Sequence, residues 1–242
     1  MRLAICTTAF NAALGEGSLT QLELFEYCAR RIGVDGIVLD VAHFPRHDDD
    51  YVAQLKKLSA DLALSIVAVR DDRLTIQPSN ALAIAAGLGA PYVLTRMPDG
   101  GTDPVARYRE ALGELSQALS LAKRVNVTLA VRNVAGSLAS DAFELGRLRK
   151  EADSAWLRYA LDPAALGAPP DAKLRTHAVL GFRGLEQVGP GGEDPMAPAI
   201  LDAFPSFPGF LCLDYLGTPP EAVASAQLLA GWRRIMARRD LE

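Results

Sequence analysis

The sequence has 242 residues, of which 50% are hydrophobic, and a formal net charge of -4. This length and hydrophobic content suit one globular domain with a large core, and we predict a single domain over residues 1–242. The acidic balance argues against a nucleic-acid surface, because phosphate binding relies on clustered Lys and Arg side chains.

No charged and then apolar leader precedes the first predicted strand, and no apolar run reaches the roughly 18 residues that a membrane helix needs. We therefore expect a cytoplasmic protein without a membrane partner. The three cysteines, Cys6, Cys28 and Cys212, are an odd number. They indicate buried thiols in a reducing compartment rather than a disulfide framework.

Short apolar runs alternate with amphipathic stretches along the chain. Residues 2–8 predict a strand, and apolar residues at helical spacing from the cap at Ser18 to Gly33 predict a helix. The alternation predicts further strands over residues 36–40, 64–70, 91–96, 128–133, 157–162, 177–183 and 209–214. It predicts further helices over residues 48–63, 80–88, 104–125, 140–150, 197–204 and 219–238, with a short or irregular helix in the proline-containing connection 163–175.

Eight β/α units of this kind can form an open doubly wound sheet or a closed barrel. No G-x-G-x-x-G follows the first strand and no Walker-type glycine motif occurs, so a nucleotide-binding open sheet has no support. We predict the α/β class and a single (β/α)8 TIM barrel. The site of such a barrel lies at the carboxyl ends of its strands.

Charged residues end seven of the predicted strands, where a buried strand would simply stop. They are Asp40, Arg70, Arg96, Arg132, Asp162, Arg183 and Asp214. Arginine keeps its charge when partly buried and offers a planar fork of donors that suits carboxylate or phosphate. The rim therefore predicts a small polar or anionic substrate.

Residues next to the rim extend this candidate site. Asn133 follows Arg132 and either orients substrate hydroxyl groups or caps the loop, and His43 lies in the loop after the second strand. The predicted substrate-binding residues are Asp40, His43, Arg70, Arg96, Asn133 and Arg183.

Other polar residues near the strand ends are assigned to loops or to the far end of the barrel. Asp71 and Asp72 follow Arg70, and we expect both to be solvated loop acids. His177 is expected to begin the seventh strand, away from the site. The Gly- and Pro-rich residues 188–195 form a loop long enough to reach over the barrel mouth.

Four stretches follow the order of units in a known family. Residues 29–40 hold a Gly-x-Asp-Gly turn that feeds a strand ending in an acid, and the others are residues 85–94, 127–133 and 208–214. Together they resemble the xylose isomerase-like family of TIM barrels, which includes sugar and sugar-phosphate isomerases and epimerases. The resemblance implies the barrel fold and chemistry next to a carbonyl group.

The resemblance also implies a divalent metal at the mouth, held by a Glu on strand five, an Asp on strand six, a His on strand seven and a Glu on strand eight. The chain has Arg132, Asp162, Gly181 and Asp214 at these places, and the family's His three residues after the strand-six Asp is Ala165. Arg132 would repel a metal, and two aspartates are few ligands for a hard or transition cation. We therefore expect no cofactor, and a divalent metal is disfavoured.

Two functions remain open. The first is an isomerase, epimerase or related lyase in which Arg132 stabilises an enolate oxygen and Asp162 or Asp214 transfers the proton. The second is a non-catalytic barrel that binds an anionic metabolite or a protein partner, with its mouth closed by Arg/Asp ion pairs. No sequence feature identifies an interface, and a homo-oligomer is left open.

Overall fold

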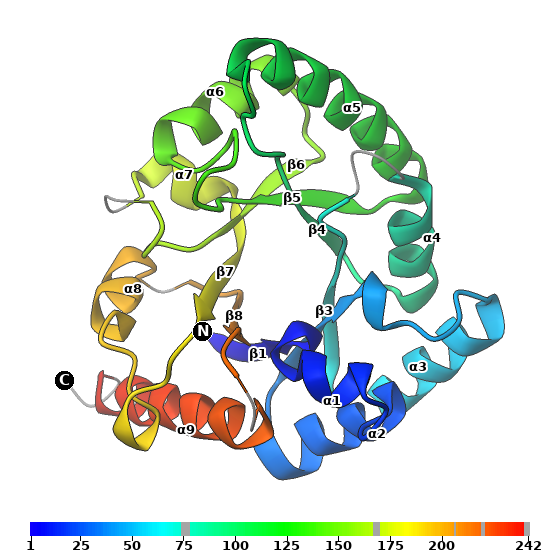
Figure 1. Cartoon of the computed structure of the whole chain (residues 1–242), viewed down its shortest axis with the longest axis vertical. Helices are drawn as coiled ribbons and strands as arrows, with labels where there is room; N and C mark the ends of the chain where they lie inside the picture. The colour runs from blue at the N-terminus through cyan, green and yellow to red at the C-terminus, as the bar shows by residue number, and fades with distance from the viewer. Residues whose placement is uncertain (74–77, 167–169, 206, 219–220, 240–242) are drawn as a thin grey trace.

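Eight parallel strands close into a barrel in chain order (Figure 1). The computed structural model describes residues 1–73, 78–166, 170–205, 207–218 and 221–239. The strands are β1 Arg2–Cys6, β2 Gly36–Asp40, β3 Ser65–Arg70, β4 Tyr92–Arg96, β5 Thr128–Arg132, β6 Leu157–Leu161, β7 Ala178–Leu185 and β8 Phe210–Tyr215. Because β8 pairs with β1, every described strand has two neighbours. The predicted (β/α)8 TIM barrel is confirmed.

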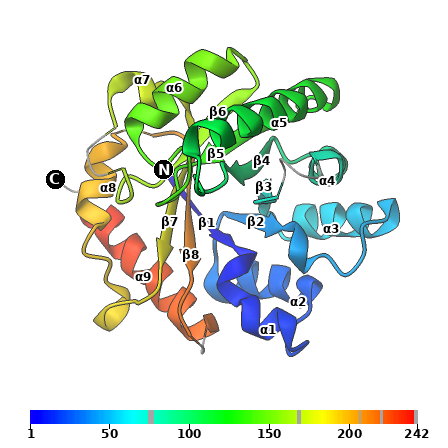
Figure 2. The same ribbon diagram turned by 45° about the horizontal axis from the view of Figure 1, so that its top comes forward.

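The helices form a ring outside the barrel (Figures 1 and 2). They are α1 Asn11–Gly15, α2 Gln21–Glu26, α3 Asp49–Asp61, α4 Pro78–Leu88, α5 Pro104–Val125, α6 Ala142–Ala152, α7 Ala172–His177, α8 Ala197–Ala203 and α9 Glu221–Arg239. The predicted helix 104–125 coincides with α5, and the other predicted ends differ by a few residues. Position 219, where the last helix was expected to begin, lies outside the described residues.

The connection from β1 to α2 contains two short helical elements that the sequence pattern did not predict. A 3-10 turn, η1 Thr7–Phe10, and the short helix α1 precede α2. Thr20 caps α2, the helix continues into a π turn over Tyr27–Ile32, and Gly33 ends it with a φ of 73°. Glycine has no Cβ atom, so it adopts this left-handed backbone conformation at the end of a helix with less steric strain than other residues. The early turn places Thr8 beside Asp214 and Arg70 at the barrel mouth.

Two predictions about the seventh unit were wrong. His177 does not begin β7 but is the last residue of α7. The 3-10 turn η4 Pro190–Gly192 packs against α9, so this part of the connection lies along the outer helix and not over the mouth. A Cβ added to Gly192 would lie 1.7 Å from the carbonyl oxygen of Gln227, which explains why glycine is required there.

Hydrophobic side chains form two layers of core. The larger layer lies between the strands and the helices. The smaller layer fills the barrel interior and uses mainly small residues, including Ala4, Ala68, Ala130 and Ala160. The three cysteines are buried and free. None of the described helices is long and apolar enough to cross a membrane.

Candidate functional site

Side-chain alternation carries six of the seven predicted rim residues towards the barrel interior. Every second residue of a strand points to the same face. Each of the six stands two positions after a residue of the interior core, as Val38 with Asp40, Ala68 with Arg70, Leu94 with Arg96, Ala130 with Arg132, Ala160 with Asp162 and Cys212 with Asp214. Arg183 instead follows the interior residue Phe182 directly, so it points the other way.

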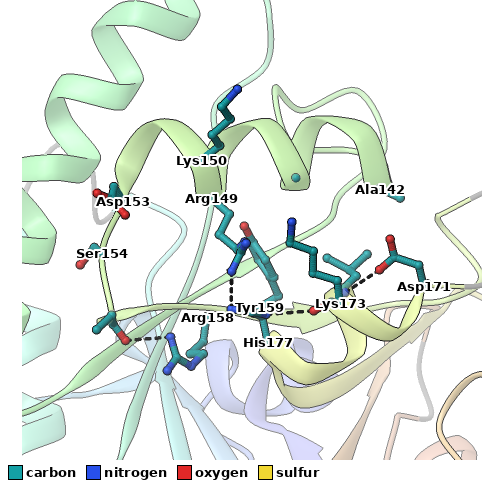
Figure 3. A pocket seen from close by; sticks show the side chains of 13 residues that line it. Ala142, Arg149, Lys150, Asp153, Ser154, Arg158, Tyr159, Asp171, Lys173 and His177 are labelled. Atoms are coloured by element: carbon teal, nitrogen blue, oxygen red, sulfur yellow. Dashed lines mark hydrogen bonds between the residues drawn. The ribbon is translucent and has the colours of Figure 1, made fainter.

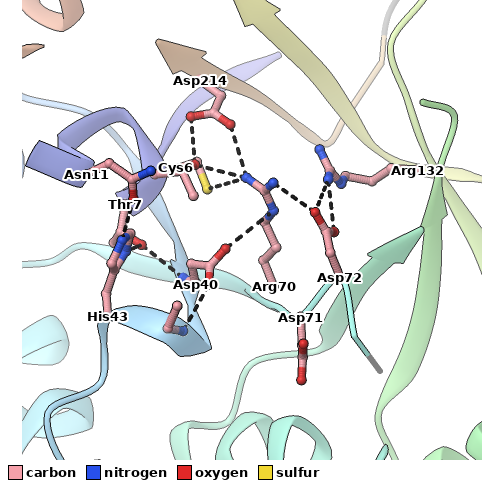
Figure 4. Close-up of polar contacts among 12 residues, drawn as sticks. Cys6, Thr7, Asn11, Asp40, His43, Arg70, Asp71, Asp72, Arg132 and Asp214 are labelled. Carbon is pink, nitrogen blue, oxygen red and sulfur yellow. Dashed lines mark hydrogen bonds and ion pairs between the residues drawn. The ribbon is translucent and has the colours of Figure 1, made fainter. Parts of the chain in front are cut away.

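The guanidinium of Arg70 lies among three carboxylates (Figure 4). Its Nη1 donates a hydrogen bond to Oδ2 of Asp214 at 3.2 Å, and its Nη2 donates to Oδ2 of Asp72 at 2.9 Å. Its Nε lies 3.5 Å from Oδ2 of Asp40. Thr8, in the turn after β1, donates to Oδ1 of Asp214 at 2.7 Å and accepts from Nη1 of Arg70 at 3.0 Å.

Arg132 shares one of these carboxylates with Arg70. Its Nη2 donates to both oxygens of Asp72, at 2.9 Å to Oδ1 and 2.8 Å to Oδ2. Its guanidinium carbon lies 4.7 Å from the centre of the Phe182 ring, close enough for a cation–π contact. The carboxylate of Asp72 is thus held between two guanidinium groups.

This arrangement overturns the prediction that Asp71 and Asp72 are solvated loop acids. Asp72 stands two residues after Arg70 and keeps the same inward direction, although β3 has ended. Asp71 is buried and turned away from the arginines, and its Oδ1 accepts the backbone N–H of Arg73 at 2.8 Å. The sequence signal for Asp72 was its even spacing from Arg70, which the strand pattern alone does not extend into a loop.

The surroundings shift the pKa values of Asp72, Asp162 and Asp214 in different directions. Burial raises the pKa of Asp214, which is 1% exposed, and outweighs the lowering by Arg70 and Thr8. Burial likewise raises the pKa of Asp162 more than Arg183 lowers it. For Asp72 burial is outweighed by the two arginines, so its pKa lies below the ordinary value. Asp214 and Asp162 therefore hold a proton more readily than Asp72 does.

A second polar cluster stands at the ends of β6 and β7. Arg183 donates from Nε to Oδ2 of Asp194 at 3.0 Å and from Nη2 to Oδ1 at 3.2 Å. Its Nη1 lies 3.9 Å from Oδ2 of Asp162. The side chain of Asp194 is 0% exposed. Arg183 is therefore held mainly by a buried acid that the sequence did not single out.

Asn133 joins the ends of β5 and β6 through the main chain. Its Nδ2 donates to the carbonyl oxygen of Asp162 at 2.9 Å, and its Oδ1 accepts the backbone N–H of Asp162 at 2.8 Å. Both ends of the amide are occupied by these bonds. Of the two alternatives for this residue, the geometry matches the loop cap rather than the ligand for substrate hydroxyl groups.

His43 belongs to a polar chain beside Asp40 (Figure 4). Its Nδ1 lies 2.8 Å from Oγ1 of Thr7 and its Nε2 lies 2.7 Å from Oδ1 of Asn11. The same Oγ1 of Thr7 accepts the backbone N–H of Asp40 at 2.9 Å. Burial lowers the pKa of His43 more than Asp40 raises it, which fits a neutral ring that accepts from Thr7 and donates to Asn11.

The hydrogen-bond partner of Arg96 belongs to neither cluster. Its Nη2 donates to Oδ1 of Asp99, whose side chain is exposed. Arg96 and Arg132 are register partners on β4 and β5, so two cations stand side by side at this part of the rim.

The mouth does not fit the divalent metal that the family resemblance implies. The carboxylates of Asp40, Asp72 and Asp214 surround the guanidinium of Arg70, which already supplies the cation. Arg132 adds a second positive charge. Within the ranges that the structure describes, no three His, Cys, Asp or Glu side chains are grouped so as to hold a metal ion.

A basic groove of about 650 Å³ lies elsewhere, between α6 and α7 (Figure 3). Arg149 and Lys150 in the last turn of α6 line it, with Lys173 and His177 of α7. Nη1 of Arg149 donates to Nε2 of His177 at 2.6 Å, and Nδ1 of His177 donates to the carbonyl oxygen of Lys173 at 2.9 Å. Cations at helix C-termini offset the helix dipole, and none of the predicted site residues lines this groove.

Solved structures match this chain over nearly its whole length. The probable 3-DHS dehydratase AsbF from Bacillus anthracis, involved in petrobactin synthesis, has a TM-score of 0.75 at 14% identity, covering 99% of this chain and 100% of that one. An L-ribulose 3-epimerase has a TM-score of 0.73 at 17% identity over 99% and 97% of the two chains. A xylose isomerase domain-containing protein from Salmonella typhimurium LT2 has a TM-score of 0.72 at 15% identity over 100% and 97%.

The fold is that of the xylose isomerase-like TIM barrels. The resemblance seen in the four sequence stretches is thus confirmed at the level of the fold. No protein-family model matches the sequence, and a comparison with curated proteins finds no relative. The matched structures include proteins named for dehydration and for epimerisation, and a shared fold does not by itself determine a function.

Proposed function

We propose that the protein catalyses proton transfer next to the carbonyl group of a small anionic substrate, as an isomerase, an epimerase or a related lyase does. The substrate class is a sugar phosphate or a small carboxylic acid. The observation that carries the proposal is that Arg70 and Arg132 both donate hydrogen bonds to the carboxylate of Asp72 at the carboxyl ends of the strands. This is the end of a TIM barrel where reactions take place.

Asp162 is the proton-transfer group in this proposal. Its side chain is 13% exposed, more open than that of Asp214, and burial raises its pKa. Its Oδ1 accepts the backbone N–H of Ala164 at 3.0 Å, while the contact of Oδ2 with Nη1 of Arg183 is long, at 3.9 Å. Oδ2 therefore has lone pairs left for a substrate proton.

The reaction begins when the carboxylate of Asp162 removes the proton from the carbon next to the carbonyl group. The C–H bond breaks, and its electron pair moves to the carbonyl oxygen as an enolate, whose negative charge Arg132 stabilises. Isomerisation is completed when Asp162 returns the proton to the neighbouring carbon and the hydroxyl proton there passes to the enolate oxygen. Epimerisation needs a second acid on the opposite face of the carbon, and Asp214, whose pKa is raised by burial, is the candidate for it. Asp214 orients Arg70 through the hydrogen bond of 3.2 Å.

The other predicted substrate-binding residues have different places in this scheme. Asp40 and His43 lie beside Arg70 and contact the substrate only if it extends towards β2. Arg96, whose acid partner is exposed, is the rim arginine best able to turn towards a second polar group of the substrate. Asn133 and Arg183 support Asp162 from the main chain and from the side chain respectively.

A non-catalytic barrel that binds an anionic metabolite or a protein partner is the second candidate. The observation that favours it is the pairing of all four rim arginines with acids: Arg70 with Asp214, Arg96 with Asp99, Arg132 with Asp72 and Arg183 with Asp194. Such a network can serve stability alone. The two candidates differ in whether bound ligand exchanges a carbon-bound proton.

Proton exchange with deuterated water, followed by NMR over a panel of sugar phosphates and keto or hydroxy acids, separates the candidates. We expect exchange next to the carbonyl group of at least one compound with the wild-type protein, and loss of exchange but not of binding in Asp162→Asn. Asp202→Asn, at an exposed ion pair of α8, is the matched control and should exchange normally. Binding without exchange of any bound compound would assign the protein to the second candidate.

The same assay after treatment with a chelator tests whether proton exchange requires a metal. We expect unchanged exchange, because the guanidinium of Arg70 already lies among the mouth carboxylates. One stoichiometric divalent ion in the purified protein, together with loss of exchange on chelation, would overturn the metal-free scheme.

A further inference from the structure

Asp72 differs from the other two acids around Arg70 in its place in the chain. Asp40 and Asp214 belong to strands of the barrel, whereas Asp72 follows β3 in the connection to α4. The side chain of Asp72 is 31% exposed, against 8% for its partner Arg132. The carboxylate therefore meets the two arginines from the solvent side of the mouth.

The contacts of Arg132 depend on this one acid. Both of its hydrogen bonds to acid oxygens go to Asp72, and within the described ranges its Nε has no hydrogen-bond partner although it is buried. Arg70, by contrast, keeps Asp214 and Thr8 if Asp72 moves away. Departure of Asp72 would leave Arg132 as a buried cation in need of an anion.

We propose that Asp72 fills the binding position of the substrate's anionic group, and that a carboxylate or phosphate monoester takes its place between Arg132 and Arg70. This inference rests on the proposed function only in assuming that the mouth receives an anionic ligand. The exchange keeps the charge balance, because one oxyanion replaces another on the same donors. Neutral sugars have no group that can do this.

An internal competitor lowers the apparent affinity for any ligand that must displace it. The apparent Kd equals the intrinsic Kd divided by the fraction of molecules in which the site is free. Asp72→Asn removes the negative charge and keeps the shape, so it should open the site to added anions. Asp194→Asn is the matched control, because Asp194 also pairs with an arginine near the rim but is fully buried.

Isothermal titration with inorganic phosphate, in a buffer without other anions except a fixed low chloride concentration, tests the exchange. We expect Asp72→Asn to bind phosphate at least about tenfold more tightly than the wild-type protein, and Asp194→Asn to bind like wild type. Addition of Arg132→Gln to Asp72→Asn should abolish the gain. Equal affinity in wild type and Asp72→Asn, or a gain that survives Arg132→Gln, would overturn the proposal.

Chemical rescue gives a second measurement that does not depend on a phosphate ligand. In Asp72→Ala, formate should fill the vacated carboxylate position and raise the melting temperature by more than it does in wild type. In Asp194→Ala the lost carboxylate is buried away from solvent, and formate should have no such selective effect. If Asp72→Ala does not fold, the titration of Asp72→Asn still decides the question.

These measurements need no turnover, so their outcome is independent of the proton-transfer scheme. Tight phosphate binding by Asp72→Asn in a protein that exchanges no substrate proton would support the anion site and overturn the proposed reaction. Proton exchange without any effect of Asp72→Asn on phosphate binding would do the reverse.

Discussion

The two sides of the barrel mouth hold similar residues in different ways. At the ends of β3, β5 and β8, Arg70 and Arg132 share Asp72, which is 31% exposed and reaches in from a connection. At the ends of β6 and β7, Arg183 is paired with Asp194, whose side chain is 0% exposed. A carboxylate that solvent reaches can be exchanged for a ligand, whereas a buried one is a fixed part of the fold. This difference is the reason why the proposed anion site lies on the first side and the proposed support of Asp162 on the second.

The largest expected effect is on the buried pair. Asp194→Ala should destabilise the protein by about 3–5 kcal/mol, because it leaves the guanidinium of Arg183 buried without its acid. Urea unfolding at pH 7, followed by circular dichroism, measures the loss. Asp202→Ala, at an exposed pair of α8, should change stability by less than about 0.5 kcal/mol. A smaller loss for Asp194→Ala than for Asp72→Ala would reverse the comparison.

The second-largest loss of stability is expected at the link between β5 and β6. Asn133→Ala removes both hydrogen bonds to the backbone of Asp162. Two part-buried hydrogen bonds that contribute about 0.5–1.5 kcal/mol each predict a loss of about 1–3 kcal/mol. Because Asp162 then loses its fixed position, proton exchange should fall by more than substrate binding. An unchanged exchange rate in a destabilised protein would show that Asn133 supports the fold but not the reaction.

The carboxylate of Asp72 should make stability depend on pH. Asp72 has a lowered pKa in the folded state, so its contribution is present above the unfolded value of about 3.9 and is lost as pH falls through the folded pKa. Asp72→Asn should cost about 1–2 kcal/mol at pH 7, and the difference from wild type should shrink below about pH 4. Unfolding curves at pH 7, 4.5 and 3 measure it.

Asp162 and Asp214 act in the opposite direction. Their pKa values are raised in the folded state, so the folded protein takes up protons at a higher pH than the unfolded chain. Their contribution therefore favours folding as pH falls towards the ordinary aspartate value. Between pH 7 and pH 4.5 the stability of the wild-type protein relative to Asp162→Asn should therefore increase as pH falls, and a decrease would contradict this assignment.

The strand pattern was sufficient to predict most of the fold, because a buried parallel strand leaves a short apolar run between helical patterns. Residues 36–40 and 104–125 coincide with β2 and α5. The seventh unit failed because the short helix α7 runs directly into β7 at His177, with no turn residue between them. The packing of Gly192 on α9 is a long-range contact, and no local pattern could reveal it.

The candidate site was harder to predict, because strand ends identify positions but not partners. Inward direction follows from parity, and it places Arg70, Arg132 and Asp214 correctly. Parity also shows that Arg183 does not point into the barrel interior, since the interior residue of β7 is its neighbour Phe182. Asp72 was missed because it stands after the end of β3, where the strand pattern no longer fixes the direction of a side chain.

The smallest expected effect concerns the pair at the edge of the mouth. Asp99→Asn removes an exposed acid from Arg96, and surface pairs of this kind contribute about 0–1 kcal/mol. Stability should therefore change little. If Arg96 binds a second polar group of the substrate, release from Asp99 should lower the KM and leave the kcat of the proton-transfer reaction unchanged, whereas Arg96→Gln should raise the KM. The same KM in wild type and both variants would remove Arg96 from the site and leave anion binding to Arg70 and Arg132.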